Sequence, residues 1–100
     1  MAKSSFQNLI DGEKAVLIDF YATWCGPCKA LAPVLKETAK DLGEQARVIK
    51  IDIDKNQQLA GKLKIMGVPT LILYKKGEQL WRQSGAMSKQ QLLDAIRPLL

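Results

Sequence analysis

The sequence contains no histidine and only two cysteines among its 100 residues. A structural zinc site needs four Cys or His ligands, and a catalytic zinc site usually needs three. Ser-His-Asp and Cys-His catalytic centres both require an imidazole. These counts exclude Cys/His zinc sites and histidine-dependent hydrolases, and we expect no bound metal. Any activity that changes between pH 6 and 8 must come from a perturbed cysteine, a perturbed carboxyl or the α-amino group.

Long hydrophobic runs and dense clusters of basic residues are also lacking. The apolar stretches are only a few residues long, whereas a membrane-spanning helix needs about 20. The net charge is +5, but the lysines are scattered, so we expect neither nucleic-acid nor membrane binding. Residues 1–7 contain one lysine and no apolar block, so we expect no signal peptide and a cytoplasmic location.

The composition that remains is that of a soluble globular protein. Hydrophobic residues make up 47% of the chain and charged residues 25%. The length suits a single domain over residues 1–100, and no repeat or Pro/Gly/Ser-rich linker divides it.

Hydrophobic periodicity predicts alternating helices and strands. Residues 15–21 (AVLIDFY) are almost continuously apolar, which is typical of a strand buried on both faces. Ser88 and Gln91 form a capping box that begins the last helix. The predicted helices are 6–10, 27–42, 57–64 and 88–99, and the predicted strands are 15–21, 47–54, 70–74 and 79–83. We expect strands linked through a helix to be parallel and the final hairpin to be antiparallel. This order predicts a three-layer α/β domain with a central mixed sheet of four strands and four helices.

The chemistry is concentrated in the motif Cys25-Gly26-Pro27-Cys28, which follows the first strand and begins the long helix. Unpaired backbone N–H groups and the positive end of the helix dipole favour a thiolate at Cys25. The alternatives are a structural disulfide or two small buried side chains. A disulfide closing so short a loop stabilises the fold by only ~2 kcal/mol on the loop-entropy model. A redox pair is therefore the favoured interpretation.

Residues 18–29 (IDFYATWCGPCK) resemble the active-site segment of thioredoxins. The resemblance extends from Phe6 to the C-terminus through segments that match at the family's spacing, namely Ala32-Pro33, 50–54 (KIDID), 67–70 (GVPT), 76–78 (KGE) and 85–86 (GA). It implies the thioredoxin fold and a protein disulfide reductase that serves electron transport and cell redox homeostasis. It also implies disulfide-containing client proteins as partners. The family binds no cofactor. The resemblance implies that thioredoxin reductase would reduce the Cys25–Cys28 disulfide with electrons from NADPH.

Catalytic roles follow from the resemblance. Cys25 would attack a substrate disulfide, and Cys28 would resolve the mixed disulfide. Asp19 interrupts an apolar strand, so burial is expected to raise its pKa unless it points to solvent at a sheet edge. In the family this acid takes the proton from the resolving cysteine, and Lys50 resembles the lysine that moderates its pKa; an ordinary strand lysine is the alternative.

The resemblance also implies a substrate-docking face. Pro69 would be the family's cis-proline beside the disulfide, which leaves the backbone of Val68 free to pair with an extended substrate. The residues expected on this face are Trp24, Gly26, Pro27, Val68, Pro69, Gly85 and Ala86. Trp24 could instead belong to the core.

Two departures from the family pattern carry expectations. Too few residues precede Phe6 for the first strand that thioredoxins usually have, so the strand predicted over residues 47–54 would become a sheet edge. We therefore expect a monomer with weak self-association through this edge. Tyr21 stands where many members carry Trp, which we expect to change packing near the site but not its chemistry.

Two other functions compete with disulfide reduction. One is a thioredoxin-fold binding subunit or scaffold whose thiols are incidental, although the set Cys25, Cys28, Asp19 and Pro69 argues against it. The other is an oxidase or isomerase of an oxidising compartment. Gly26-Pro27 between the cysteines and the expected absence of a signal peptide argue against that function.

Overall fold

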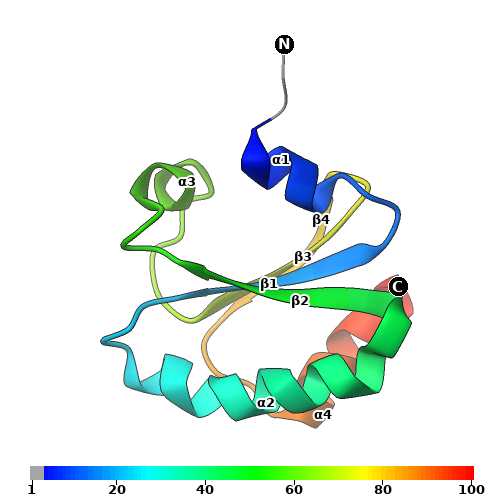
Figure 1. Cartoon of the computed structure of the whole chain (residues 1–100). Coiled ribbons are helices and arrows are strands. Elements are labelled where there is room, and N and C mark those ends of the chain that lie inside the picture. The colour runs from blue at the N-terminus through cyan, green and yellow to red at the C-terminus, as the bar shows by residue number, and fades with distance from the viewer. Residues whose placement is uncertain (1–3) are drawn as a thin grey trace.

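A computed structural model describes residues 4–100 of the chain. In this part of the chain, α-helices alternate with the strands of a single mixed sheet (Figure 1). The helices are α1 (Ser5–Ile10), α2 (Gly26–Leu42), α3 (Gln57–Lys62) and α4 (Lys89–Ile96). The strands are β1 (Ala15–Tyr21), β2 (Ala46–Asp52), β3 (Thr70–Lys75) and β4 (Glu78–Ser84), and short 3₁₀ turns follow α2 (η1, Gly43–Gln45) and α4 (η2, Arg97–Leu99). The predicted fold class and element order are confirmed.

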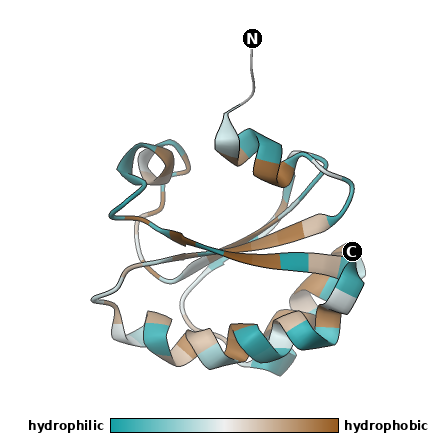
Figure 2. Cartoon of the chain, viewed as in Figure 1, coloured by the Kyte–Doolittle hydropathy of each residue, from teal (hydrophilic) through white to brown (hydrophobic). Residues whose placement is uncertain are grey.

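The sheet is the middle of three layers. Its strand order is β2-β1-β3-β4, so β1 and β3 are central. Helices α1 and α3 cover one face, and α2 and α4 cover the other (Figure 1). Figure 2 shows hydrophobic residues concentrated on the central strands. Strand β1 is buried from Ala15 to Phe20, as a strand covered on both faces requires.

Alternation along β1 divides the core into two clusters. Ala15 and Leu17 pack with residues of α2 and α4, whereas Val16, Ile18 and Phe20 pack with residues of α1. The same alternation places Asp19 on the face that α2 covers.

One expectation about strand direction is wrong. Strand β2 is parallel to β1, as expected for strands joined by α2, but β3 is antiparallel to β1 although α3 links it to β2. The six residues of α3 extend about 9 Å, whereas the seven residues of β2 extend about 23 Å. Helix α3 is too short to carry the chain back along the sheet, so β3 begins at the end where β2 finishes.

Smaller differences occur at element ends. Asn56 is the N-cap residue of α3, but its side chain makes no cap hydrogen bond and donates instead to the backbone carbonyl of Asp52. The last helix stops at Ile96 and continues as a 3₁₀ turn, because Pro98 has no N–H to donate to the preceding turn. Ser88 forms the predicted capping box on α4, and Ser4 forms a second capping box on α1.

Candidate redox site

Cys25 and Cys28 form a disulfide at the start of α2, with their Cα atoms 5.2 Å apart. Cys25 is the N-cap residue, and its sulfur accepts a hydrogen bond from the backbone N–H of Cys28 at 3.1 Å. Pro27 occupies the first turn, where a helix needs no N–H donor. The local sequence therefore places the Cys25 sulfur where the unpaired N–H groups of a helix begin.

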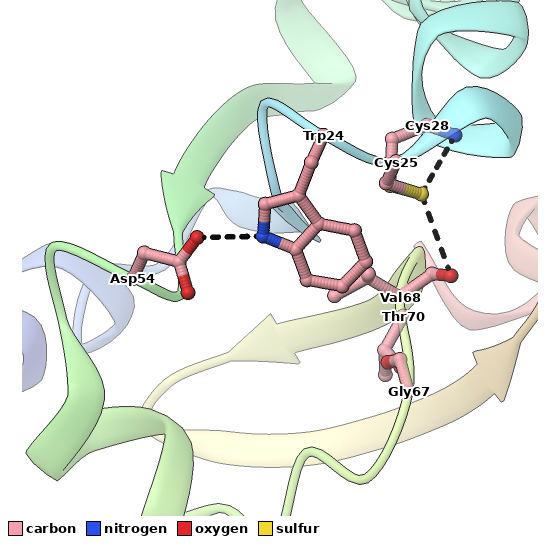
Figure 3. The surroundings of a disulfide bond; sticks show 7 residues. All are labelled: Trp24, Cys25, Cys28, Asp54, Gly67, Val68 and Thr70. Atoms are coloured by element: carbon pink, nitrogen blue, oxygen red, sulfur yellow. Dashed lines mark hydrogen bonds between the residues drawn. A yellow bond between two sulfur atoms is a disulfide. The ribbon is translucent and has the colours of Figure 1, made fainter.

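The loop before β3 lies against this sulfur, because β3 begins at the end of the sheet where β1 finishes. The Cys25 Sγ lies 3.6 Å from the carbonyl oxygen of Val68 (Figure 3). The Val68–Pro69 peptide bond is cis, as the resemblance implies. The Thr70 hydroxyl donates to the carbonyl of Gly67 at 2.6 Å, which closes the loop just before β3. Residues 43 positions apart in the chain thus meet at the disulfide.

Gly85 is held beside Pro69. Its N–H donates to the Pro69 carbonyl at 2.8 Å, and its φ of +96° is one that a side chain would strain. The hydroxyls of Thr70 and Ser84 lie 3.0 Å apart and add a second link between the loop and the end of β4. These contacts bring Gly85 next to the cis-proline, as the docking-face prediction requires.

Trp24 is an exposed side chain, not a core residue. It has 67% of its surface accessible, and its indole Nε1 donates to Oδ2 of Asp54 at 2.8 Å (Figure 3). The sequence patterns alone did not predict this partner. The predicted parallel pairing of the first two strands pointed toward it. With Tyr21 opposite Asp52, the loops after β1 and β2 lie at the same end of the sheet.

The remaining residues of the expected docking face differ in exposure. Gly26, Pro27, Gly85 and Ala86 are exposed, Val68 is half-buried and Pro69 is buried. Cys25 and Cys28 are themselves only 4% exposed. A partner would therefore meet a rim of small residues and Trp24 around a nearly covered disulfide.

Asp19 is fully buried, so it is not an edge aspartate that points to solvent. Neither of its carboxyl oxygens has a hydrogen-bond partner among residues 4–100. Burial raises the pKa of Asp19 from 3.8 to about 6, and the charge of Lys50 acts in the opposite direction. Lys50 lies opposite Asp19 in the β1–β2 register. A carboxyl in this state exchanges its proton close to neutral pH.

A family model described as thioredoxin matches residues 1–98. The chain belongs to the thioredoxin family. A thioredoxin of Buchnera aphidicola subsp. Baizongia pistaciae is 48% identical over 90 residues, which are 90% of this chain and 83% of that protein. "Thioredoxin Y, chloroplastic" of rice (Oryza sativa subsp. japonica) is 43% identical over 98 residues, 97% of this chain.

The relatives differ in overall length. The chain spans 58% of the rice thioredoxin. It also matches 20% of a "bifunctional thioredoxin reductase/thioredoxin" of Mycobacterium leprae, at 43% identity over 90 residues.

Within residues 4–100, no helix is both long and apolar enough to cross a membrane. The chain thus combines the thioredoxin fold with the paired cysteines of a dithiol–disulfide oxidoreductase.

Proposed function

We propose that the protein is a protein disulfide reductase and that residues 1–100 act as one thioredoxin domain. The observation that carries the proposal is the Cys25–Cys28 disulfide at the start of α2, with the Cys28 N–H directed at the Cys25 sulfur. A hydrogen bond to a sulfur that carries charge favours the thiolate over the thiol. The same sulfur lies beside the Val68 carbonyl, where an extended client segment can pair with the backbone.

The reaction begins with the reduced protein. The Cys25 thiolate attacks one sulfur of a client disulfide, the client S–S bond breaks, and one client sulfur leaves as a thiolate. Cys28 then gives up its proton and attacks the Cys25 sulfur. The Cys25–Cys28 bond forms, the mixed disulfide breaks, and the second client thiolate is released. The client gains two electrons, and the protein dithiol loses them.

Asp19 is the group proposed to accept the Cys28 proton. It lies on the sheet face covered by α2, and with a pKa of about 6 it is roughly 90% ionised at pH 7. The chain has no histidine for this role. The Lys50 charge keeps more of the Asp19 carboxyl ionised than burial alone allows.

The reduced form must be regenerated by an electron donor. We propose a thioredoxin reductase that draws on NADPH, and the fusion of both names in the M. leprae relative supports this pairing. Clients are disulfide-containing proteins that dock on the face around Trp24, Val68 and Gly85. This cycle would serve electron transport and redox homeostasis in the cytoplasm. The rice relative and one of Arabidopsis thaliana are named as chloroplastic, which makes a plastid the alternative location.

Trapping of the mixed disulfide tests the proposal directly. Cys28→Ser removes the resolving thiol, so the variant is expected to accumulate disulfides with client proteins through Cys25. These adducts should appear on non-reducing gels and disappear with dithiothreitol. The matched control is Cys25→Ser, which should form none. If Cys28→Ser traps nothing while Cys25→Ser does, the order of attack is reversed. Partner binding that survives removal of both cysteines would favour the scaffold function.

A further inference from the structure

The ring of Tyr21 carries a contact that the reaction described above does not use. Tyr21 is the last residue of β1, and the Lys50 Nζ lies over its ring, 4.5 Å from the centroid. A cation within about 6 Å of an aromatic face is attracted by the ring quadrupole. None of the ion pairs found among residues 4–100 includes Lys50. The aromatic face therefore adds to the attraction of the Asp19 charge in holding the ammonium group on its flexible stem.

The contact lies at the resolving cysteine. A pocket of about 330 Å³ is lined by Tyr21 and Lys50 together with Cys28 and Lys29. Alternation along β1 places Tyr21 on the same sheet face as Asp19, and Lys50 is the β2 residue opposite Asp19. The pocket thus gathers the sulfur that must lose a proton and the cation that acts on its proposed acceptor.

We propose that Tyr21 is a positioning residue for the resolving step, because its ring holds the Lys50 ammonium in the pocket beside Cys28 instead of releasing it to solvent. The inference rests on the proposed function, which assigns resolution to Cys28 and proton acceptance to Asp19. It is compatible with the expectation that a tyrosine in place of tryptophan leaves the chemistry of the site unchanged. Either aromatic residue offers a face to the lysine.

The consequence is electrostatic. The Lys50 charge lowers the pKa of Asp19 against the effect of burial. Without the ring, the exposed Lys50 side chain is free to extend into water, and its effect on the carboxyl weakens. On β3 the residue opposite Asp19 is the apolar Leu71, and among residues 4–100 Lys50 is the charged group that shifts the pKa of the carboxyl. On α2, Cys28 and Lys29 line the pocket with Lys50, and Lys36 lines a second pocket with Lys50.

If the Tyr21 ring only fills space, its variants are expected to give different results. Tyr21→Leu keeps an apolar side chain but removes the aromatic face, whereas Tyr21→Phe keeps the face and removes only the hydroxyl. A role in packing would show as a loss of stability with no link to Lys50. A positioning role would show as an altered Asp19 titration that depends on Lys50 and is rescued by phenylalanine.

The test is a carboxyl titration of Asp19 by ¹³C NMR in the oxidised protein, where the disulfide prevents thiol titration. For Tyr21→Leu we expect the midpoint to rise by about 0.3 pH units, an about twofold change in the protonation equilibrium. Tyr21→Phe should match the unmodified protein. In a Lys50→Met background, adding Tyr21→Leu should cause no further shift.

An unchanged midpoint in Tyr21→Leu overturns the inference, and so does an equal shift in the Lys50→Met background. Thermal unfolding verifies that each variant is folded, and Tyr21→Met provides the same comparison if the leucine variant is not. The titration needs no substrate and no turnover. Failure of the proposed function, seen as no disulfide reduction by the unmodified protein, is therefore a separate outcome from failure of the Tyr21 contact.

Discussion

Asp19 couples the chemistry of the site to the stability of the fold. Its folded pKa of about 6 lies above its ordinary value of 3.8. The folded state therefore binds this proton more tightly than the unfolded state does. The resulting stabilisation is complete below pH 3.8 and is lost as pH rises through 6, a change of about 3 kcal/mol in the free energy of unfolding.

Replacing Asp19 with asparagine should remove this pH dependence. We expect the stability of Asp19→Asn relative to the unmodified protein to increase by about 2 kcal/mol between pH 4 and pH 8, since part of the full change lies below pH 4, as measured by urea unfolding of the oxidised proteins. Asp94→Asn, at an exposed carboxyl on α4, is the control and should leave the pH profile unchanged. If the profiles of Asp19→Asn and the unmodified protein are parallel, Asp19 has the same pKa in the folded and unfolded states and the prediction is wrong.

At the residue scale, the sequence predicts the reactive positions but not the residues that they contact. The cysteine motif and the carboxyl within an apolar strand were recognisable because each breaks a local pattern. The Trp24–Asp54 hydrogen bond and the Lys50 contact with Tyr21 were not predicted. Each joins residues from two different strand ends, so it depends on the register between β1 and β2.

At the scale of single elements, α1 and α4 begin where serine side chains cap them. Ser88 accepts a hydrogen bond from the Gln91 N–H, and the Gln91 side chain accepts one from the Ser88 N–H. These two bonds satisfy donors that would otherwise lack a partner at the start of α4, a helix whose buried residues belong to the core.

Ser88→Ala should lower the free energy of unfolding by about 1 kcal/mol, because alanine has no side-chain oxygen to accept the bond from the Gln91 N–H. Chemical denaturation measures the change. Ser5→Ala is the matched control, since Ser5 lies inside the first turn of α1 and is exposed, and a change within about 0.5 kcal/mol is expected. Equal losses in the two variants would contradict a specific contribution from the cap.

Element positions were predictable because capping and periodicity are local. The structure reproduces the first strand with its predicted bounds and the long helix to within one residue at its start. The direction of β3 was not predictable from the same patterns. It depended on whether α3 was long enough to return the chain along the sheet, which is a property of lengths compared between elements.

At the scale of the whole molecule, β2 forms one edge of the sheet within residues 4–100. Its side chains Val48, Ile49 and Ile51 are half-buried, so apolar surface lies next to unpaired backbone groups. Such an edge can pair with the edge of another chain. The arrangement supports the expectation of weak self-association.

We therefore expect sedimentation velocity to show a sedimentation coefficient that rises with concentration. Val48→Lys should reduce this rise, because a charge on the edge opposes strand pairing. Leu80→Lys, on the opposite edge strand β4, is the control and should not. A constant sedimentation coefficient, together with full hydrogen-exchange protection of residues 48–53, would contradict the expectation.

Local sequence was sufficient for the fold class, the element order and the redox motif, because periodicity, capping and the Cys-X-X-Cys spacing act over a few residues. It was also sufficient to identify a carboxyl that burial would perturb. The strand order, the antiparallel β3 and the meeting of Cys25 with Val68 required the folded chain. The position of the Lys50 Nζ over the Tyr21 ring also required the folded chain. These features depend on contacts between residues distant in the chain, which form only when the strands pair in register and the helices pack on the sheet.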